Sequence, residues 1–327
     1  MERKLRWGVL GTGRILGKAG AALKTVENGE WLGVAGRSPG RSAEAAERFG
    51  VPRAYDSYEE LLQDPDIDAV YIALLNHLHA EWAVRACRAG KHVLLEKPFA
   101  PDADEAERIV EAARSCGVVV EEAFVWRHHP AFTALRELIA EGIVGDWVCF
   151  RGHYSFPAGE DSTRWVREWG GGALLDIGCY PVAWARFITG EEPSSVDAAE
   201  LIDDKHGVDR RFAGTLYFSG GRTAHFDAAL DMAHGADFEL IGTKGRISVE
   251  LRVDAESWTI ASRQGLDERV WTMDRITPFR REAEAFAARA MGASSEEAQA
   301  LARDAVNQAR VLGALRQSAE RGERVWL

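Results

Sequence analysis

The chain has 327 residues, of which 46% are hydrophobic and 28% are charged, so it can bury a substantial core and exceeds the usual size of one compact domain. Its formal net charge of −11 opposes an extended basic surface for nucleic acid or anionic lipid. It has no run of about eighteen apolar residues and no apolar secretory stretch at its start. The sequence therefore predicts a two-domain cytoplasmic protein that binds neither nucleic acid nor membrane.

In the first part of the chain, short apolar runs alternate with amphipathic segments. The apolar runs predict strands at residues 5–10, 31–35, 69–74, 92–95 and 118–120. The segments between them predict helices that include residues 42–49, 79–89 and 103–115. Strands that alternate with helices favour a doubly wound parallel sheet. The expected fold class is therefore α/β, with a dinucleotide-binding Rossmann domain over residues 1–123.

The pattern changes after about Phe124. A predicted helix at residues 130–141 is followed by a predicted strand at 146–156. Further alternating runs predict strands at residues 196–201, 211–218, 222–231, 237–241 and 245–251, with a turn at Lys244-Gly245. A last amphipathic helix is expected to begin at a capping box of Ser294 and Glu297 and to stop at Gly322. Residues 124–327 are thus expected to form an α+β domain on a largely antiparallel sheet.

A glycine-rich turn, Gly11-Thr12-Gly13, follows the first predicted strand. Gly11 permits a tight turn, and Gly13 lets the backbone approach a pyrophosphate at a helix N-terminus. Leu16 stands where this fingerprint usually has Gly or Ala. The alternative is an ordinary strand-to-helix turn, which the surrounding β-α-β order disfavours. The residues of this turn expected to contact a dinucleotide are Gly11, Thr12, Gly13, Arg14 and Ile15.

The second predicted strand ends in Gly36-Arg37-Ser38, where a NAD-specific site usually has Asp or Glu for the ribose hydroxyls. Arg37 offers a guanidinium fork and Ser38 a hydroxyl to a 2′-phosphate, and Arg41 is close by in sequence. The sequence therefore favours NADP(H) over NAD(H). The alternative is that these are solvated loop arginines without a ligand.

Several blocks resemble the Gfo/Idh/MocA oxidoreductase family. They are Asn76-His77-Leu78-His79, the run from Ala89 to Glu96-Lys97-Pro98, Glu122-Ala123-Phe124, the run from Gly170 to Pro181, and the run from Gly242 to Ile247. The second-domain blocks are similar to the branch that contains glucose-fructose oxidoreductase, dimeric dihydrodiol dehydrogenase and NADP-dependent xylose dehydrogenase. The resemblance covers nearly the whole chain and implies an NAD(P)-dependent dehydrogenase or reductase that acts on CH–OH groups.

The resemblance implies that Tyr180 transfers the proton and that Lys97 is its electrostatic partner. Such a role is chemically sound, because an ammonium lowers the pKa of a neighbouring phenol. Asp176 is a further catalytic candidate, since its i,i+4 spacing places it on the face of Tyr180 in an unbroken helix. Pro181 can distort that helix. The other interpretation of Asp176 is helix capping or pairing with Arg164.

The resemblance also implies a cis peptide bond before Pro98 and a Glu96 that orients Lys97 or contacts the nicotinamide ribose. Further cofactor contacts are expected at Leu74, Asn76, His79, Glu96, Lys97, Arg164 and Trp165. Substrate contacts are expected at Arg127, Tyr154, Phe156, Asp176 and Tyr180. For His77 and His79 a purely structural role is an equal alternative. The pair His128-His129 lacks the spacing of metal ligands, and no metal is assigned.

The expected substrate is a sugar, polyol or trans-dihydrodiol. Two other interpretations stay open: a catalytically silent dinucleotide-binding regulator, and a sugar–sugar oxidoreductase with a tightly held cofactor. A homodimer or homotetramer is expected through the sheet of the second domain. This expectation rests on the resemblance and on the cost of leaving a wide apolar sheet face exposed.

Overall fold

The computed structural model describes residues 3–251, 257–274, 278–292 and 295–327. The chain divides into two compact units. The first comprises Met1–His128 and Thr277–Val306, and the second comprises His129–Ile276 and Asn307–Leu327. Helix α9 (Ser295–Arg321) contributes residues to both units.

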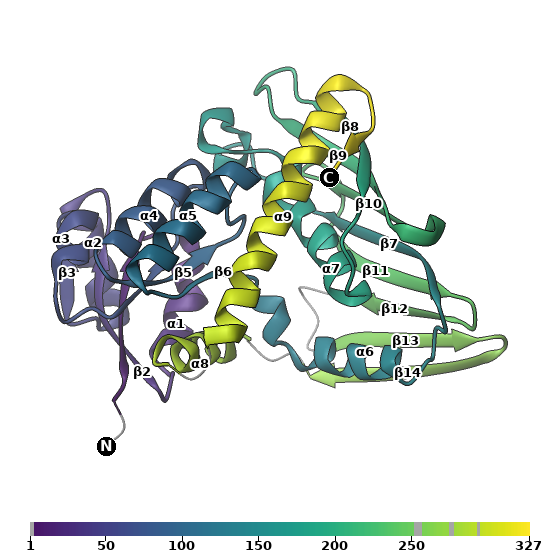
Figure 1. Ribbon diagram of the computed structural model, residues 1–327. Coiled ribbons are helices and arrows are strands. Elements are labelled where there is room, and N and C mark those ends of the chain that lie inside the picture. Colours follow the sequence, from purple (N-terminus) through teal and green to yellow (C-terminus); the bar gives the residue numbers. More distant parts are fainter. Residues whose placement is uncertain (1–2, 252–256, 275–277, 293–294) are drawn as a thin grey trace. The chain divides into compact units, whose positions relative to one another are not determined.

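The first unit is built on a six-stranded parallel sheet in the order β3-β2-β1-β4-β5-β6 (Figure 1). Its strands are β1 (Leu5–Leu10), β2 (Gly29–Ala35), β3 (Arg53–Tyr55), β4 (Ala69–Ile72), β5 (His92–Glu96) and β6 (Val120–Ala123). Its helices and helical turns are η1 (Arg14–Gly17), α1 (Ala19–Leu23), α2 (Pro39–Phe49), α3 (Tyr58–Gln63), η2 (Asn76–Leu78), α4 (His79–Arg88), α5 (Ala103–Cys116), η3 (Val125–His128) and α8 (Phe279–Ala290). The strand order reverses between β1 and β4, and open α/β sheets bind ligands outside the carboxyl ends of their strands at such a point.

Local sequence explains where these helices begin and end. Ser57 accepts a hydrogen bond from the Glu60 amide at 3.2 Å, and Asp102 accepts one from the Glu105 amide at 3.1 Å, so both side chains cap free N–H groups. Gly50 and Gly117 end α2 and α5 in the left-handed conformation. The predicted Rossmann fold class is confirmed.

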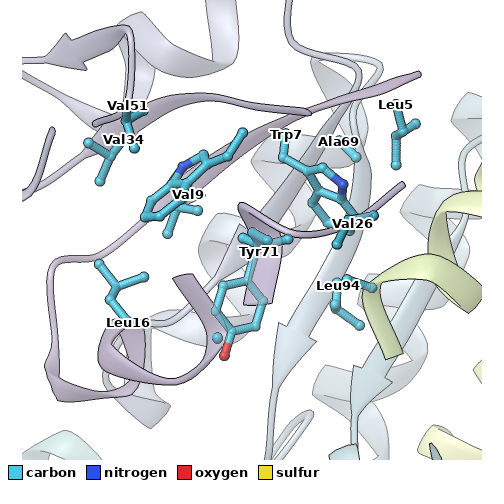
Figure 2. Close-up of a cluster of buried hydrophobic side chains, with 14 of the residues drawn as sticks. Leu5, Trp7, Val9, Leu16, Val26, Val34, Val51, Ala69, Tyr71 and Leu94 are labelled. Atoms are coloured by element: carbon cyan, nitrogen blue, oxygen red, sulfur yellow. The ribbon is translucent and has the colours of Figure 1, made fainter. Parts of the chain in front are cut away.

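Helix α8 completes the core of the first unit. Phe286 is fully buried, and its ring centroid lies 5.1 Å from that of Trp7 on β1. Figure 2 shows Trp7 and Tyr71 among the aliphatic side chains of this cluster, which also contains Ala283 and Ala287 of α8. From the sequence, residues 124–327 are expected to lie together in a second domain, whereas α8 packs with the first unit. The functional division between the two domains stays a prediction.

The second unit is built on a nine-stranded sheet in the order β14-β13-β12-β11-β7-β10-β9-β8-β15. The strands are β7 (Trp147–Ser155), β8 (Ser195–Ile202), β9 (Asp209–Tyr217), β10 (Thr223–Ala229), β11 (Gly235–Gly242), β12 (Arg246–Glu250), β13 (Ser257–Gln264), β14 (Asp267–Asp274) and β15 (Val325–Trp326). Every pairing is antiparallel except that of β7 with β10. The predicted antiparallel character is confirmed, although the β13–β14 hairpin was not expected from the sequence.

Helices α6 and α7, the π-helical turn η6 and the end of α9 pack against this sheet, and short helical turns lie in its connections. These elements are α6 (Pro130–Ala140), the short turns η4 (Thr163–Trp165), η5 (Arg167–Trp169) and η7 (Ser219–Gly221), the π-helical turn η6 (Leu174–Gly178), α7 (Cys179–Thr189) and the end of α9. Glycines in the strands make room for them: a Cβ at Gly152 would lie 2.8 Å from Pro181, and one at Gly214 would lie 2.9 Å from Leu315. Helix α9 stops at Gly322 as predicted, with a φ of 64°. Ser294 of the predicted capping box lies outside the described residues.

The opposite face of the sheet is polar, which corrects one expectation. Alternate strand positions carry charged side chains there, and a hollow of about 1120 Å³ is lined by residues that include Arg151, His153, Asp227, Asp237, Glu239 and Glu250. In an antiparallel sheet with one covered face, the apolar positions turn to the helices and the polar ones to the other side. The argument for oligomerisation from an exposed apolar sheet was therefore wrong. None of the described helices is long and apolar enough to cross a membrane.

The packing of α8 generates a stability prediction. Replacing Phe286 with Ala should lower the free energy of unfolding of the first unit by about 3–5 kcal/mol, because it removes a fully buried ring and leaves a cavity against Trp7. Urea titrations measure this. Leu266→Ala, at a side chain that is 103% exposed, is the control and should change stability by less than about 0.5 kcal/mol. An equally small loss for Phe286→Ala would contradict the packing.

Candidate active site

The turn after β1 approaches the end of β4 too closely for a side chain. A Cβ at Gly11 would lie 2.4 Å from the Ala73 carbonyl oxygen, and Gly11 has a φ of +114°. The Gly11 amide donates to the Ala35 carbonyl at 2.8 Å, and the Ala73 amide donates to the Leu10 carbonyl at 2.9 Å. Gly11 is therefore required by both conformation and space.

The segment after this turn differs from the regular helix expected of the fingerprint. Gly13 precedes the 3₁₀ turn η1, and a Cβ at Gly13 would meet nothing within 4 Å, so its backbone faces open space. Leu16, which replaces the third small residue of the fingerprint, is buried. The close approach of helix to strand occurs at Gly20 instead, where a Cβ would lie 2.9 Å from the Trp31 ring.

The end of β2 leaves its basic side chains in solvent. The Gly36 amide donates to the Ser42 hydroxyl at 2.8 Å, which fixes the turn into α2. Arg37, Ser38 and Arg41 around this turn are exposed. A parallel sheet brings the ends of β1 and β2 to the same edge, so Arg37 and Gly13 leave this sheet on the same side. An open glycine turn with exposed arginines beside it fits a phosphorylated dinucleotide.

Lys97 follows β5, and two carboxylates hold the backbone around it. Glu96 accepts a hydrogen bond from the Lys97 amide at 3.2 Å, and Glu122 at the end of β6 accepts one from the Phe99 amide at 2.9 Å. Glu96 also accepts a hydrogen bond from the Tyr71 hydroxyl of β4. The Lys97–Pro98 peptide bond is cis, as predicted. The roles of Tyr71 and Glu122 were missed, since only the strand register shows that their side chains reach this edge.

Both ring nitrogens of His79 contact backbone carbonyl oxygens. The side chain is buried, with Nδ1 at 2.8 Å from the Pro98 carbonyl oxygen and Nε2 at 3.2 Å from the Leu74 carbonyl oxygen. Burial lowers the pKa of His79 from 6.5 to about 4, so the ring is neutral near pH 7. A neutral ring carries one N–H, and the shorter distance favours donation to Pro98. The Leu74 carbonyl then keeps its capacity to accept a hydrogen bond from a bound molecule.

A buried cluster of charged side chains connects α8 with β6. Arg289 donates to both carboxylate oxygens of Glu121 on β6, at 2.6 and 2.7 Å. Two turns earlier on the same face of α8 lies Glu282. Its side chain is buried, and its Oε1 has no hydrogen-bond partner among the described residues. Burial, with Glu96 and Glu121 nearby, raises the pKa of Glu282 well above its ordinary value. The neutral form of this carboxyl group is thus favoured relative to an exposed glutamate.

In the second unit, the glycine-rich block prepares the start of α7. Gly172 has a φ of +117°, and a Cβ there would lie 1.8 Å from an oxygen of Asp209. Asp209 accepts a hydrogen bond from the Leu174 amide at 2.7 Å. Burial raises the pKa of Asp209 to about 7. The π-helical turn η6 then leads into α7 with Pro181 in its first turn, so the chain continues as a helix through the proline.

Asp176 is paired with Arg164, which is the alternative left open by the sequence. The Arg164 Nε donates to the Asp176 carboxylate, and the guanidinium carbon lies 4.9 Å from the centre of the Phe156 ring. Arg164 thus connects the predicted catalytic carboxylate with a predicted substrate-contacting ring. This fixes the carboxylate beside a cation, and it leaves a catalytic role for Asp176 as a prediction.

Tyr180 belongs to an aromatic cluster at the end of β7. Its ring centroid lies 5.1 Å from that of Tyr154 and 6.0 Å from that of Trp184. Tyr154 also lies 6.4 Å from the ring of His234, which precedes β11. Aromatic rings with polar atoms at their edges are typical of surfaces that bind sugars. His234 was missed because its segment has no distinctive pattern.

Two other predicted contact residues make local contacts. Arg127 of the first unit pairs with Asp304, and its guanidinium carbon lies 5.5 and 5.4 Å from the rings of Phe124 and Trp126. The Trp165 indole donates to the Gly159 carbonyl at 2.9 Å, and its ring stacks on His206 at 5.2 Å. Ligand contacts of Arg127 and Trp165 stay predictions. Within the described ranges no three His, Cys, Asp or Glu side chains gather as they would around a metal.

Comparison with known proteins now decides the family. Residues 5–124 match the model described as the oxidoreductase family with an NAD-binding Rossmann fold, and residues 132–248 match the GFO/IDH/MocA C-terminal domain. The chain belongs to the Gfo/Idh/MocA oxidoreductase family. The predicted family is therefore confirmed, and with it the prediction of an oxidoreductase that uses a nicotinamide dinucleotide.

Relatives within this Gfo/Idh/MocA family act on sugars and diols. The chain is 35% identical to D-xylose 1-dehydrogenase (NADP(+)) 2 of Haloferax volcanii over 324 residues, which cover 96% of this chain and 98% of that protein. It is 34% identical to trans-1,2-dihydrobenzene-1,2-diol dehydrogenase of Xenopus laevis over 247 residues, which cover 75% of this chain and 74% of that protein. A 3-ketoreductase from Actinomadura kijaniata, solved with NADP and TDP-benzene, matches with a TM-score of 0.91 and 30% identity over 97% of this chain and 98% of that one.

The burial of His79 predicts a pH-dependent stability. Because its pKa is about 4 in the folded protein and 6.5 in the unfolded chain, the neutral ring contributes stability above pH 6.5, and this is lost as the pH falls towards 4. His79→Gln should flatten the loss of unfolding free energy between pH 7 and pH 4 by about 3 kcal/mol. Urea titrations across this range measure it. The exposed neighbour provides the control His77→Gln, and an acid slope of His79→Gln equal to that of the wild type would refute the assignment.

Proposed function

We propose that this protein is an NADP(H)-dependent oxidoreductase that transfers hydride between the nicotinamide and a sugar, polyol or trans-dihydrodiol. The observation that carries the proposal is the group around Tyr180: a phenol 5.1 Å from the Tyr154 ring, in the same unit as the Arg164–Asp176 pair with its neighbour Phe156. It combines an exchangeable proton, aromatic faces and an ion pair, which suits a polyhydroxylated substrate. The NADP(+)-dependent xylose dehydrogenase and the dihydrodiol dehydrogenase among the relatives support this substrate class.

The proposed proton-transferring group is Tyr180. NADP(H), when bound, supplies or accepts the hydride. The Tyr180 hydroxyl gives its proton to the substrate oxygen when a carbonyl is reduced, and takes it back when the alcohol is oxidised. Lys97 is the proposed partner whose positive charge favours the phenolate. Its backbone, held by Glu96 and Glu122, limits where its ammonium can reach.

The proposed cofactor site follows the carboxyl edge of the first sheet. The open backbone from Gly11 to Gly13 receives the pyrophosphate, together with Thr12, Arg14 and Ile15. Arg37, Ser38 and Arg41 bind the 2′-phosphate, which gives NADP(H) its advantage over NAD(H). The remaining proposed cofactor contacts are Leu74, Asn76, His79, Glu96, Lys97, Arg164 and Trp165. Proposed substrate contacts, besides Tyr180, are Arg127, Tyr154, Phe156 and Asp176.

The proposed phosphate site predicts a cofactor-specific defect. Arg37→Ala should raise the KM for NADPH by about 10-fold or more, because one charge-assisted contact to the 2′-phosphate is lost, and should leave the KM for NADH unchanged. Steady-state kinetics with both cofactors measure this. Arg48→Ala, an exposed arginine at the far end of α2, is the matched control. Equal effects of Arg37→Ala on NADPH and NADH would reject the 2′-phosphate role.

The proposed proton transfer predicts a loss of turnover at Tyr180. Tyr180→Phe should lower kcat by about 100-fold or more while NADPH binding, followed by its fluorescence, stays unchanged. The assay follows reduced nicotinamide absorbance with D-xylose, D-glucose and trans-1,2-dihydrobenzene-1,2-diol. Tyr217→Phe, which removes a hydroxyl bonded to Asp197 on the polar sheet face, is the control. Wild-type turnover in Tyr180→Phe would rule out the phenol as proton donor.

The same assay separates the other interpretations. A silent regulator would bind NADPH and turn over none of the probes, and a sugar–sugar oxidoreductase would be purified with nicotinamide absorbance.

We further propose that the reaction takes place in the cytoplasm. The polar face of the second sheet is the proposed contact between copies in a homodimer or homotetramer, since it carries both Arg151 and Arg246 and carboxylates such as Glu239.

A further inference from the structure

A continuous chain of hydrogen bonds crosses the polar face of the second sheet. His153 of β7 is bonded through Nδ1 to the Asp227 carboxylate of β10 at 2.6 Å, and through Nε2 to the Ser155 hydroxyl at 2.7 Å. The Ser155 hydroxyl in turn donates to the Ala233 carbonyl at 2.5 Å. Asp227, His153, Ser155 and Ala233 therefore form a single line, which we call the His153 clamp.

The clamp resembles a Ser-His-Asp hydrolytic triad only in its residue types. Ser155 is fully buried, and its one hydroxyl proton is committed to a backbone carbonyl. A nucleophile must instead be accessible and must give its proton to the histidine. The Ser155 hydroxyl accepts from the ring and passes the connection to the main chain, so the clamp holds a segment of chain.

The proton count of the clamp depends on the charge of His153. Its three contacts each need one donor. A protonated ring supplies two N–H groups, to Asp227 and Ser155, and the serine hydroxyl supplies the third donor, to Ala233. A neutral ring supplies one, which the Asp227 carboxylate retains because it is the stronger acceptor, so Nε2 becomes an acceptor and the Ser155 proton must serve either His153 Nε2 or the Ala233 carbonyl. Deprotonation of His153 therefore weakens the hold on Ala233.

The surroundings of His153 favour the protonated ring. Its hydrogen bond with Asp227 raises the pKa of His153 above 6.5 and outweighs the effect of burial, and the charge of Asp237 on β11 acts in the same direction. Glu250 on β12 lies near Asp237, and Arg151 on the histidine's own strand is turned to Glu239. Gly235 makes room for the ring, because a Cβ there would lie 2.9 Å from His153 Cδ2.

The segment that the clamp holds, residues 230–235, runs from the end of β10 to the first residue of β11 and reaches the aromatic cluster. His234 follows Ala233 directly, is exposed, and lies 6.4 Å from the Tyr154 ring, which lies 5.1 Å from the ring of Tyr180. Within the described parts of the chain, His234 has no hydrogen-bond partner of its own. An imidazole in this place can donate to, or accept from, a hydroxyl of a molecule bound against Tyr154.

We infer that His234 is a specificity-determining residue that binds a hydroxyl group of the sugar or diol, and that the His153 clamp is the device that positions it. The ligand in this inference rests on the proposed function. The clamp does not, since it is defined by contacts within the second unit. As the pH rises through the pKa of His153, the clamp loses one hydrogen bond, and residues 230–235 become less firmly held.

Hydrogen exchange of the full-length protein tests the clamp without substrate. The protection factor of the peptide that covers residues 230–235 is measured by mass spectrometry from about pH 5.5 to about pH 9, which brackets the ordinary histidine pKa of about 6.5. It should fall about 5-fold as His153 loses its proton. Ser155→Ala should show the low value at every pH. Asp227→Asn should move the fall to lower pH, a shift that a merely structural contact would not produce. Ser248→Ala, at another serine that bonds a backbone carbonyl on this sheet, should behave as the wild type.

A protection factor that is independent of pH and equal in Ser155→Ala and the wild type would overturn the clamp.

The role of His234 is tested by kinetics with whichever of D-xylose, D-glucose and trans-1,2-dihydrobenzene-1,2-diol the wild type turns over. His234→Ala should raise the KM for that substrate by about 2- to 10-fold and leave the KM for NADPH unchanged, and His234→Gln should restore part of it. His225→Ala, at a histidine bonded to Thr215 and Thr223, is the matched control.

The outcomes separate the two parts of the inference. An unchanged substrate KM in His234→Ala overturns the role of His234. Absence of turnover by the wild type with every probe defeats the proposed function and the role of His234 together, while the exchange experiment still decides the clamp. If turnover is present and exchange does not respond to pH or to Ser155→Ala, the clamp alone is wrong.

Discussion

The arrangement at the end of β5 depends on two half-buried carboxylates at the edge of the sheet, which hold a short piece of backbone. Glu96 and Glu122 accept the amides of Lys97 and Phe99, on either side of Pro98, which has no amide hydrogen to donate. Carboxylate acceptors form the stronger class of hydrogen bond. The Lys97 backbone is thereby fixed relative to β5 and β6, so the ammonium group proposed to act with Tyr180 would lose less conformational freedom when it acts.

In the second unit, strand ends and the start of a helix hold the side chains of the candidate site in place. Its sheet has parallel strands only at β7 and β10, and the carboxyl ends of these two strands lead to Tyr154 and Phe156 on one side and to the segment with His234 on the other. Helix α7 starts over this edge and contributes Tyr180. The polar groups of the cluster thus come from strand ends and from the start of a helix. Side chains there extend beyond the paired part of the sheet, and the sheet holds their backbone rigid.

Patterns within a few residues of one another were readable from the sequence, and partnerships across long separations were not. The bounds of β1, the stop of α9 at Gly322 and the tight turn at Gly11 follow from apolar runs and glycine conformation. The hairpin of β13 and β14 was not predicted, because its strands mix apolar residues with Ser, Arg and Glu. The polar sheet face was visible in the alternation of β7 and β11, and it was misjudged because a wide sheet was assumed to be apolar on both sides.

The candidate site divides in the same way. Lys97, Tyr180 and the glycine turn stand in local motifs, so they could be named from sequence. The pairing of Asp176 with Arg164 could only be stated as one alternative, and the partners of His79 could not be named at all, because a pairing partner is a matter of three-dimensional distance. Tyr71 and His234 have no sequence signature, and the contact of Glu122 with the Phe99 amide could not be read from its motif, so these roles follow only from hydrogen bonds and ring contacts in the structure.

The return of α8 to the first sheet has a consequence for how the protein is made. Trp7 leaves the ribosome among the earliest residues, yet its partner Phe286 is synthesised near the end of the chain. Throughout elongation the nascent dinucleotide-binding half therefore keeps an uncovered indole surface, which is a natural target for chaperones. A gene fragment that stops after residue 128 encodes the strands of this half without the helix that seals it, and such a fragment is poorly suited to separate expression.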